Sequence, residues 1–119
     1  MFNKKQLLLL LIIIGIGASS CIHDSDIAGA PVITYSGDIQ RILSANCNFP
    51  SCHGGSEMGL TTYDQVLGTV EPGNPRRSEL YRVITGRAIE KMPPSGYPDV
   101  SNADIRLIYL WIEQGAKNN

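Results

Sequence analysis

Two cysteines and a histidine lie within seven residues of one another in the segment CNFPSCH, residues 47–53, and two glycines follow. Because the three side chains are so close, the fold must suit the group that they bind or the bond that they form. A disulfide between Cys47 and Cys52 would leave His53 unexplained and would close a ring too short to stabilise the chain much. A structural zinc site needs four Cys or His ligands, and the chain has only one further cysteine and one further histidine.

Covalent attachment of haem explains all three side chains. In the Cys-x-x-Cys-His pattern of c-type cytochromes, the two thiols add to the haem vinyl groups and the adjacent histidine ligates the iron. Cys52 and His53 keep this adjacency, although four residues instead of two separate Cys47 from Cys52. A longer loop can still bring both thiols to the vinyl groups, and Pro50 suits a turn within it. The segment therefore predicts one covalent haem c, bound through Cys47, Cys52 and His53.

Residues 1–20 are predicted to be the signal peptide of a bacterial lipoprotein. Lys4 and Lys5 precede the apolar run LLLLLIIIGIGA, and ASSC supplies small residues for cleavage. The apolar run is shorter than the roughly 20 residues that cross a bilayer, which disfavours a retained anchor helix. Cys21 is then the lipidated N-terminal residue of the exported chain, although Ala18 stands where a lipobox usually has leucine. An ordinary secretory cut would instead leave Cys21 as a free thiol, a liability in an oxidising compartment.

The exported chain is predicted to comprise a lipidated tether, residues 21–33, and one haem domain, residues 34–119. Loss of Lys4 and Lys5 lowers the net charge from −1 to −3, so nucleic acid is not expected as a partner. A chain of this size has a small core, which a bound cofactor would reinforce. No Ser/His/Asp or paired-carboxylate arrangement appears, so neither an enzyme activity nor a small-molecule substrate is expected.

Four segments show helical spacing of apolar residues together with end signals. The expected helices, each with its N-cap, are residues 36–47 (Ser36), 61–68 (Thr62), 74–86 (Asn74) and 101–115 (Ser101). No segment shows sustained period-two alternation, so the fold class is predicted to be all-α. The helices are short and the connecting loops long, which suggests that the loops wrap a bound group.

The sequence also resembles a family of small bacterial c-type cytochrome domains, found in exported lipoproteins of Bacteroidetes and in planctomycete-type cytochrome proteins. Five marks over about residues 36–117 carry the resemblance: the helix before CHG, LTTY, PGNP before SELY, MPP, and WIEQGA. The resemblance implies a cytochrome c-like helical fold around the haem and single-electron transfer. With Cys47 and Cys52 on the haem and Cys21 on the lipid, no thiol is left over.

Met92 is predicted to be the second axial ligand of the iron. Met58 follows His53 by only five residues, too few to carry the chain around the haem edge, whereas Met92 follows it by 39. Pro93 and Pro94 restrict the backbone of this loop, and Met-Pro-Pro is one of the marks of the resembled family. Paired His and Met ligation is common in cytochromes c, and it raises the redox potential relative to ligation by two histidines.

Four further residues are weighed for supporting roles. Trp111 is expected to pack in the core against the first helix. Arg87 is the preferred partner for a haem propionate; Tyr97 could also donate to one but is expected to pack within its loop. Pro72 belongs to a loop whose carbonyl could accept a hydrogen bond from the ring of the proximal histidine.

The leading functional hypothesis is an exported electron carrier, lipid-anchored at the periplasmic face of a membrane or at the cell surface. Its partners would be redox proteins at the membrane or cell surface. One alternative is a haem domain with a weak or absent sixth ligand that binds a gas or peroxide. Another is a haem-free lipoprotein domain stapled by a Cys47–Cys52 disulfide.

Overall fold

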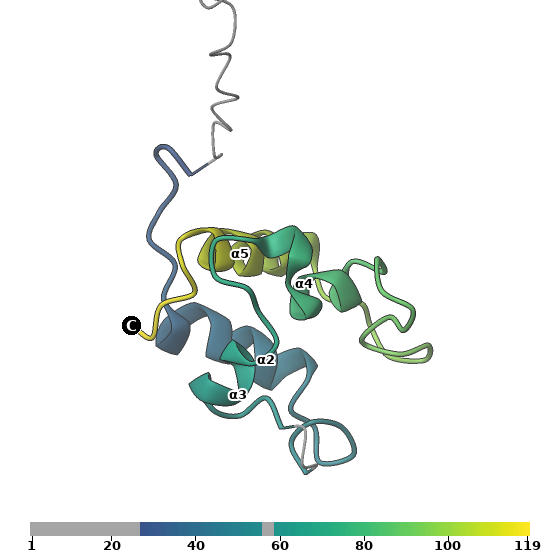
Figure 1. The fold of residues 1–119 in the computed structure, drawn as a ribbon. Helices are drawn as coiled ribbons and strands as arrows, with labels where there is room; N and C mark the ends of the chain where they lie inside the picture. The colour runs from purple at the N-terminus through teal and green to yellow at the C-terminus, as the bar shows by residue number, and fades with distance from the viewer. Residues whose placement is uncertain (1–26, 56–58) are drawn as a thin grey trace, which may run out of the picture.

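The computed structural model describes residues 27–55 and 59–119, and these residues form helices and loops without a strand (Figure 1). In chain order the elements are the π-helix η1 (Tyr35–Ile39), α2 (Gln40–Asn46), α3 (Tyr63–Leu67), the 3-10 helix η2 (Pro75–Arg77), α4 (Glu79–Ile84) and α5 (Asn102–Glu113). The all-α class predicted from the sequence is confirmed for this part of the chain. The predicted signal peptide and Cys21 lie outside it. No helix within it is long and apolar enough to span a bilayer.

The first helix begins earlier than predicted, because Thr34 and not Ser36 is its N-cap. The Thr34 hydroxyl accepts a hydrogen bond from the Gly37 N–H at 3.2 Å, and the Asp38 carboxylate accepts from both the N–H and the hydroxyl of Thr34. The backbone and side-chain hydrogen bonds from Thr34 hold the pKa of Asp38 below its usual value. Ser36 instead donates its hydroxyl to the Asn119 carbonyl at 2.9 Å, a contact that periodicity does not reveal.

The second predicted helix forms with the expected capping box, but the third is divided in two. In α3, the Thr62 hydroxyl accepts from the Gln65 N–H while the Gln65 side chain accepts from the Thr62 N–H. Between η2 and α4, Ser78 has an extended backbone, with φ −68° and ψ 128°. Its buried hydroxyl donates to the Asn74 carbonyl at 2.9 Å and accepts from the Glu71 N–H at 2.8 Å. A buried hydroxyl that is satisfied by the preceding turn thus interrupts the helix.

Helix α5 supplies much of the core. Ser101 caps it as predicted, accepting from the Asp104 N–H at 3.1 Å, and Gly115 follows it with a left-handed φ of 97°. Trp111 is fully buried, and its ring centroid lies 5.9 Å from that of Tyr35 in η1. The prediction that Trp111 packs in the core against the first helix is confirmed. Each such large apolar side chain contributes roughly 1.5–3 kcal/mol when fully buried.

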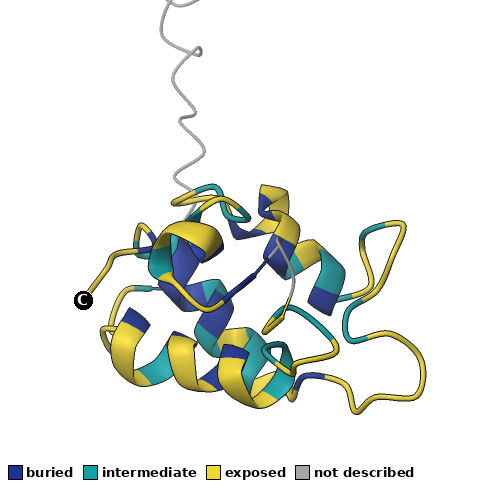
Figure 2. Ribbon diagram, turned by 90° about the horizontal axis from the view of Figure 1, so that it is seen from below, coloured by how far each residue is buried: buried dark blue, intermediate teal, exposed yellow. Residues whose placement is uncertain are grey.

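The core lies between α5 and α4 on one side and η1, α2 and α3 on the other (Figure 1). Buried positions face inward on both sides, and exposed positions face outward (Figure 2). The loops that follow α2 and α4 lie at the same end of the domain (Figure 1). This arrangement brings residues 46–53 and residues 92–97 to the two sides of one cavity.

Candidate functional site

A cavity of about 580 Å³ opens between the loop after α2 and the loop after α4. Its volume lies within the roughly 300–1,000 Å³ that is common for small-molecule and cofactor pockets. Much of its wall is apolar, with Leu60, Leu80, Val83 and Ile84 among the lining residues. Leu80, Val83 and Ile84 form one face of α4, at positions i, i+3 and i+4 of ELYRVI. The sequence contains this helical spacing, although it does not say that the face lines a cavity.

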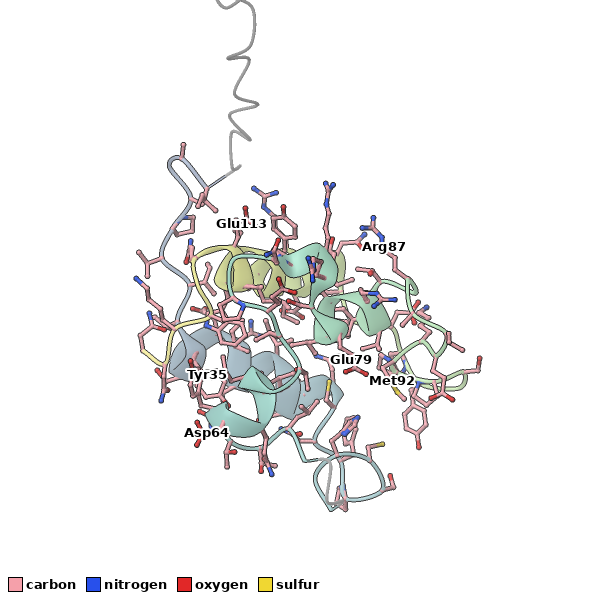
Figure 3. The ribbon with its side chains drawn as sticks, in the orientation of Figure 1. Tyr35, Asp64, Glu79, Arg87, Met92 and Glu113 are labelled. Atoms are coloured by element: carbon pink, nitrogen blue, oxygen red, sulfur yellow. The ribbon has the colours of Figure 1, made fainter. Side chains whose placement is uncertain are left out.

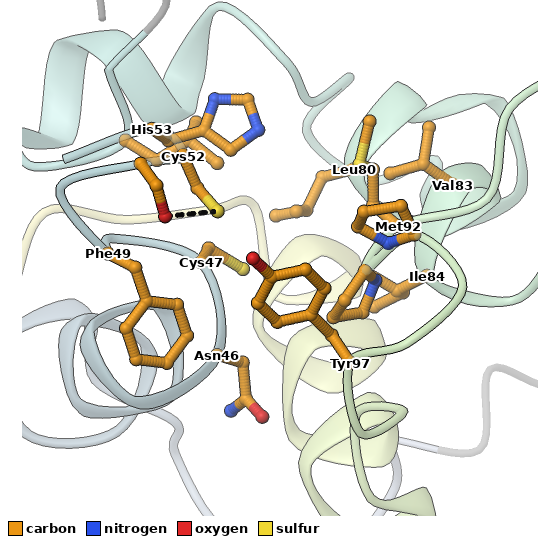
Figure 4. A pocket seen from close by; sticks show the side chains of 14 residues that line it. Asn46, Cys47, Phe49, Cys52, His53, Leu80, Val83, Ile84, Met92 and Tyr97 are labelled. Carbon is orange, nitrogen blue, oxygen red and sulfur yellow. Dashed lines mark hydrogen bonds between the residues drawn. The ribbon is translucent and has the colours of Figure 1, made fainter. Parts of the chain in front are cut away.

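All four residues predicted to bind the haem line this cavity: Cys47, Cys52, His53 and Met92. The two thiols and the imidazole come from one loop, and Met92 lies across the cavity beside Leu80 (Figure 4). The fold therefore places Met92 opposite His53, although 39 residues separate the two in the sequence. Met58, the other methionine weighed as a ligand, lies outside the described residues.

The Cys–His loop, residues 47–55, is closed by its own backbone. The His53 N–H donates to the Cys47 carbonyl at 3.3 Å, the Cys52 N–H to the Phe49 carbonyl at 2.8 Å, and the Gly54 N–H to the same carbonyl at 3.1 Å. The first of these bonds joins the two ends of CNFPSCH. The two residues in excess of the usual spacing are therefore accommodated in a turn, in which Pro50 is exposed.

Two glycines permit this closed loop. A Cβ atom at Gly54 would lie 2.4 Å from the Asn48 carbonyl oxygen, and one at Gly55 would lie 2.5 Å from the Pro50 carbonyl oxygen. Both distances are too short for any side chain, so a larger residue at either position would force the loop apart. The pattern CHGG marks the two glycines in the sequence, but only the structure shows which atoms they approach.

Cys47 and Cys52 are free thiols, both half-buried. Burial, with a smaller contribution from the neighbouring Cys52, raises the pKa of the Cys47 thiol to about 11. The thiol form of Cys47 is therefore favoured at neutral pH in the haem-free chain. The Ser51 hydroxyl lies 3.8 Å from the Cys52 sulfur, as the dashed line in Figure 4 marks.

The raised pKa predicts slow alkylation of Cys47 in the folded, haem-free chain. Because the thiolate is the reactive form, its rate with iodoacetamide should keep rising to about pH 11. Unfolding should bring the profile back to an ordinary thiol pKa of about 8.5. Burial favours the neutral thiol, so the folded state binds this proton more tightly than the unfolded state does. The resulting gain in folding stability is complete below the unfolded pKa of about 8.5. It is lost as the pH rises toward the folded pKa of about 11. Mass spectrometry of the labelled peptide measures the profile, with the chain in urea as control. An alkylation rate that stops rising below pH 9 in the folded chain would contradict the raised pKa of Cys47.

The loop that carries Met92 is held at two points. The Met92 N–H donates to the Val83 carbonyl at 3.0 Å, which ties the residue to the last turn of α4. The Lys91 ammonium lies 2.7 Å from the Asp99 carboxylate and closes the loop from outside. Pro93 and Pro94 line the cavity within this closed segment. The backbone of Met92 is therefore fixed relative to the wall formed by α4.

The structure separates the supporting residues that line the cavity from those that do not. Tyr97 lines it and directs its hydroxyl inward (Figure 4), whereas Arg87 does not line it. The Arg87 guanidinium lies 5.9 Å from the centre of the Tyr81 ring. Trp111 and Pro72 are also absent from the lining. Phe49, Asn46 and Leu60 line the cavity without having been identified from the sequence, where only the position of Phe49 inside CNFPSCH pointed to the site.

Within residues 27–55 and 59–119, no group of three or more His, Cys, Asp or Glu side chains is placed to hold a metal ion. Cys21 and His23, which the zinc alternative would need, lie outside these ranges. Comparison with known proteins finds no family model, no curated protein and no solved structure that matches the chain.

Proposed function

We propose that this protein is a lipid-anchored c-type cytochrome that carries single electrons through one covalently bound haem c. The observation that carries the proposal is the convergence of Cys47, Cys52, His53 and Met92 on one cavity. Each of the four has the chemistry that haem attachment or ligation needs, although His53 and Met92 lie 39 residues apart in the sequence. When bound, haem supplies an iron centre that gains and loses one electron.

The residues around the cavity suit this group. The free thiols of Cys47 and Cys52 lie on the His53 side, where they would form the two thioether bonds. The imidazole of His53 and the thioether of Met92 would hold the iron, one from each side of the cavity. The apolar wall of α4 would cover part of the porphyrin and limit the access of water, which helps to set the redox potential.

Electron transfer fits this ligand set better than substrate chemistry does. With His53 and Met92 both bound to iron, no coordination position would be left for a substrate. The loops that hold the two ligands are closed by hydrogen bonds and by the Lys91–Asp99 ion pair. A site held in this way would change little when the iron changes its charge.

The direct test is a haem stain of the protein after denaturing electrophoresis. Covalent haem survives denaturation, so the purified chain should stain and should yield the spectrum of a c-type pyridine haemochrome. The chain should be produced in a host that attaches haem to exported proteins. A purified chain that folds there but carries no stain would end this proposal.

The proposed lipid anchor at Cys21 can be tested separately. Cys21→Ser should release a red, soluble domain, because the substitution removes the thiol that would carry the lipid and leaves the cavity residues unchanged. Sedimentation of the native chain and the variant, with absorbance at the Soret band, measures the distribution. A variant that still sediments with membranes would favour a retained apolar helix over a lipid.

A further inference from the structure

The last residues of the predicted tether are bound to the domain. The strap, residues 31–36, runs beside the C-terminal end of α5, where the Gln114 side-chain amide contacts it twice. The Gln114 Nε2 donates to the Pro31 carbonyl at 2.8 Å, and the Ile33 N–H donates to the Gln114 Oε1 at 2.9 Å. One side chain thus binds the strap backbone as a neighbouring strand would.

The C-terminal residue extends this contact. The Tyr35 N–H donates to the Asn119 side-chain oxygen at 3.0 Å, and the Ser36 N–H donates to the Asn119 carbonyl at 3.0 Å. Ile33 is buried in the core, and the partly buried Ile27 packs against this core. Ile27, the first described residue, thus already packs on the core, and only residues 22–26 separate it from Cys21 in the sequence.

The strap and the cavity lie at opposite ends of the domain. Helices η1 and α2 run without a break from Tyr35 to Asn46, a rod of about 18 Å at 1.5 Å per residue. The strap enters at the first end of this rod, and Cys47 follows the second. Figure 3 shows the same separation, with Tyr35 on one side of the molecule and Met92 on the other.

We propose that the strap fixes the orientation of the domain, so that the face carrying residues 27–36 and the end of α5 lies toward the membrane and the cavity opens toward water. The inference rests on the proposed lipid at Cys21. The six residue steps from Cys21 to Ile27 span at most about 20 Å. A cavity about 18 Å beyond the strap could face the bilayer directly only with this link almost fully extended.

The partner that this geometry selects is a redox protein that reaches the cavity from the aqueous side, not an electron carrier dissolved in the lipid. Phe49 and Tyr97 line the cavity with 41% and 47% of their surfaces exposed. Both side chains are aromatic, and aromatic side chains are enriched at protein–protein interfaces. Tight binding of the strap therefore has a functional consequence, since it decides which surface partners can reach.

The test uses the lipidated holoprotein on vesicles whose phospholipid headgroups carry a diazirine crosslinker. After illumination and digestion, we expect crosslinked peptides from residues 27–36 and 114–119, and none from residues 47–55 or 89–97. Insertion of about 20 Gly/Ser residues after Asp26 lengthens the link to about 28 Å, and should abolish this difference. Crosslinks in the cavity loops of the native chain, at the level of those in the strap, would overturn the inference.

Gln114→Ala tests the strap itself, and Gln40→Ala, at an exposed position of α2, is the matched control. Loss of both contacts should lower the hydrogen-exchange protection of the Ile33 amide about five- to tenfold and spread the crosslinks toward the cavity loops. The control should do neither, and unchanged protection in Gln114→Ala would contradict the role of the strap. If the native chain does not sediment with vesicles, both the proposed lipid anchor and this inference are wrong. If the chain does not stain for haem, the proposed cofactor is wrong, but the orientation is still tested because the crosslinks do not depend on haem.

Discussion

Replacing both Cys47 and Cys52 with alanine should abolish covalent haem, leaving a chain that does not stain after denaturing electrophoresis. The two thiols line one side of the cavity beside His53, and no other cysteine lies among the described residues. Each single substitution should leave one thioether, and haem should become easier to extract. His53→Ala should prevent a normal holoprotein, because it removes the proximal ligand while both thiols stay in place.

Cys21→Ser is the matched control for the cysteine variants. It removes a thiol of the same type, and it should keep full covalent haem while losing the anchor. Acid–acetone extraction followed by absorbance of the pellet and the supernatant measures how much haem is covalent. A double variant whose haem still resists extraction would show that Cys47 and Cys52 are not the points of attachment.

Replacing Met92 with alanine should remove the weak far-red charge-transfer band that sulfur-to-iron ligation gives the ferric protein. Met92 lies across the cavity from His53, and its N–H is bonded to the Val83 carbonyl at 3.0 Å. The variant should keep this backbone contact, so the substitution should remove the sulfur and leave the fold of the loop in place. The potential should fall by at least about 59 mV, which is a tenfold change for a one-electron couple. The reduced variant should also bind carbon monoxide.

Two further variants separate ligation from packing. Met92→Leu keeps the apolar volume without the sulfur, so it should behave as the alanine variant does in the far-red spectrum. Met58→Leu should leave the band and the potential unchanged. A band that persists in Met92→Ala and disappears in Met58→Leu would transfer the ligand to Met58. Carbon monoxide binding by the native reduced protein would instead favour the gas-binding alternative.

The candidate residues could be chosen from the sequence because their chemistry is local. Adjacent Cys52 and His53, with a second cysteine nearby, point to haem attachment at any position in a fold. The same holds for the caps of α3 and α5, since Thr62 and Ser101 bond to N–H groups only three residues away. Interactions over so few residues leave a readable pattern, and the structure confirms these two caps.

The sequence is a poorer guide where burial, or a contact made only in the folded chain, decides the outcome. Ser36 looks like an N-cap, but its hydroxyl bonds to Asn119, and Thr34 with Asp38 caps the helix instead. The predicted helix of residues 74–86 is interrupted at Ser78, whose burial no periodicity reveals. In each case the side-chain hydroxyl makes hydrogen bonds that compete with the regular helix pattern.

By itself, the sequence determined the helical class and two of the helix caps, and it predicted which residues carry chemistry. Only the tertiary structure decided that Cys47, Cys52, His53 and Met92 line one cavity, with α4 as its wall. It also decided that the predicted tether is partly bound through Gln114. Residue type and short spacing record local bonding, whereas a cavity and a strap depend on how helices pack. Packing joins residues far apart in the chain, and the core contacts that hold them are apolar and without direction.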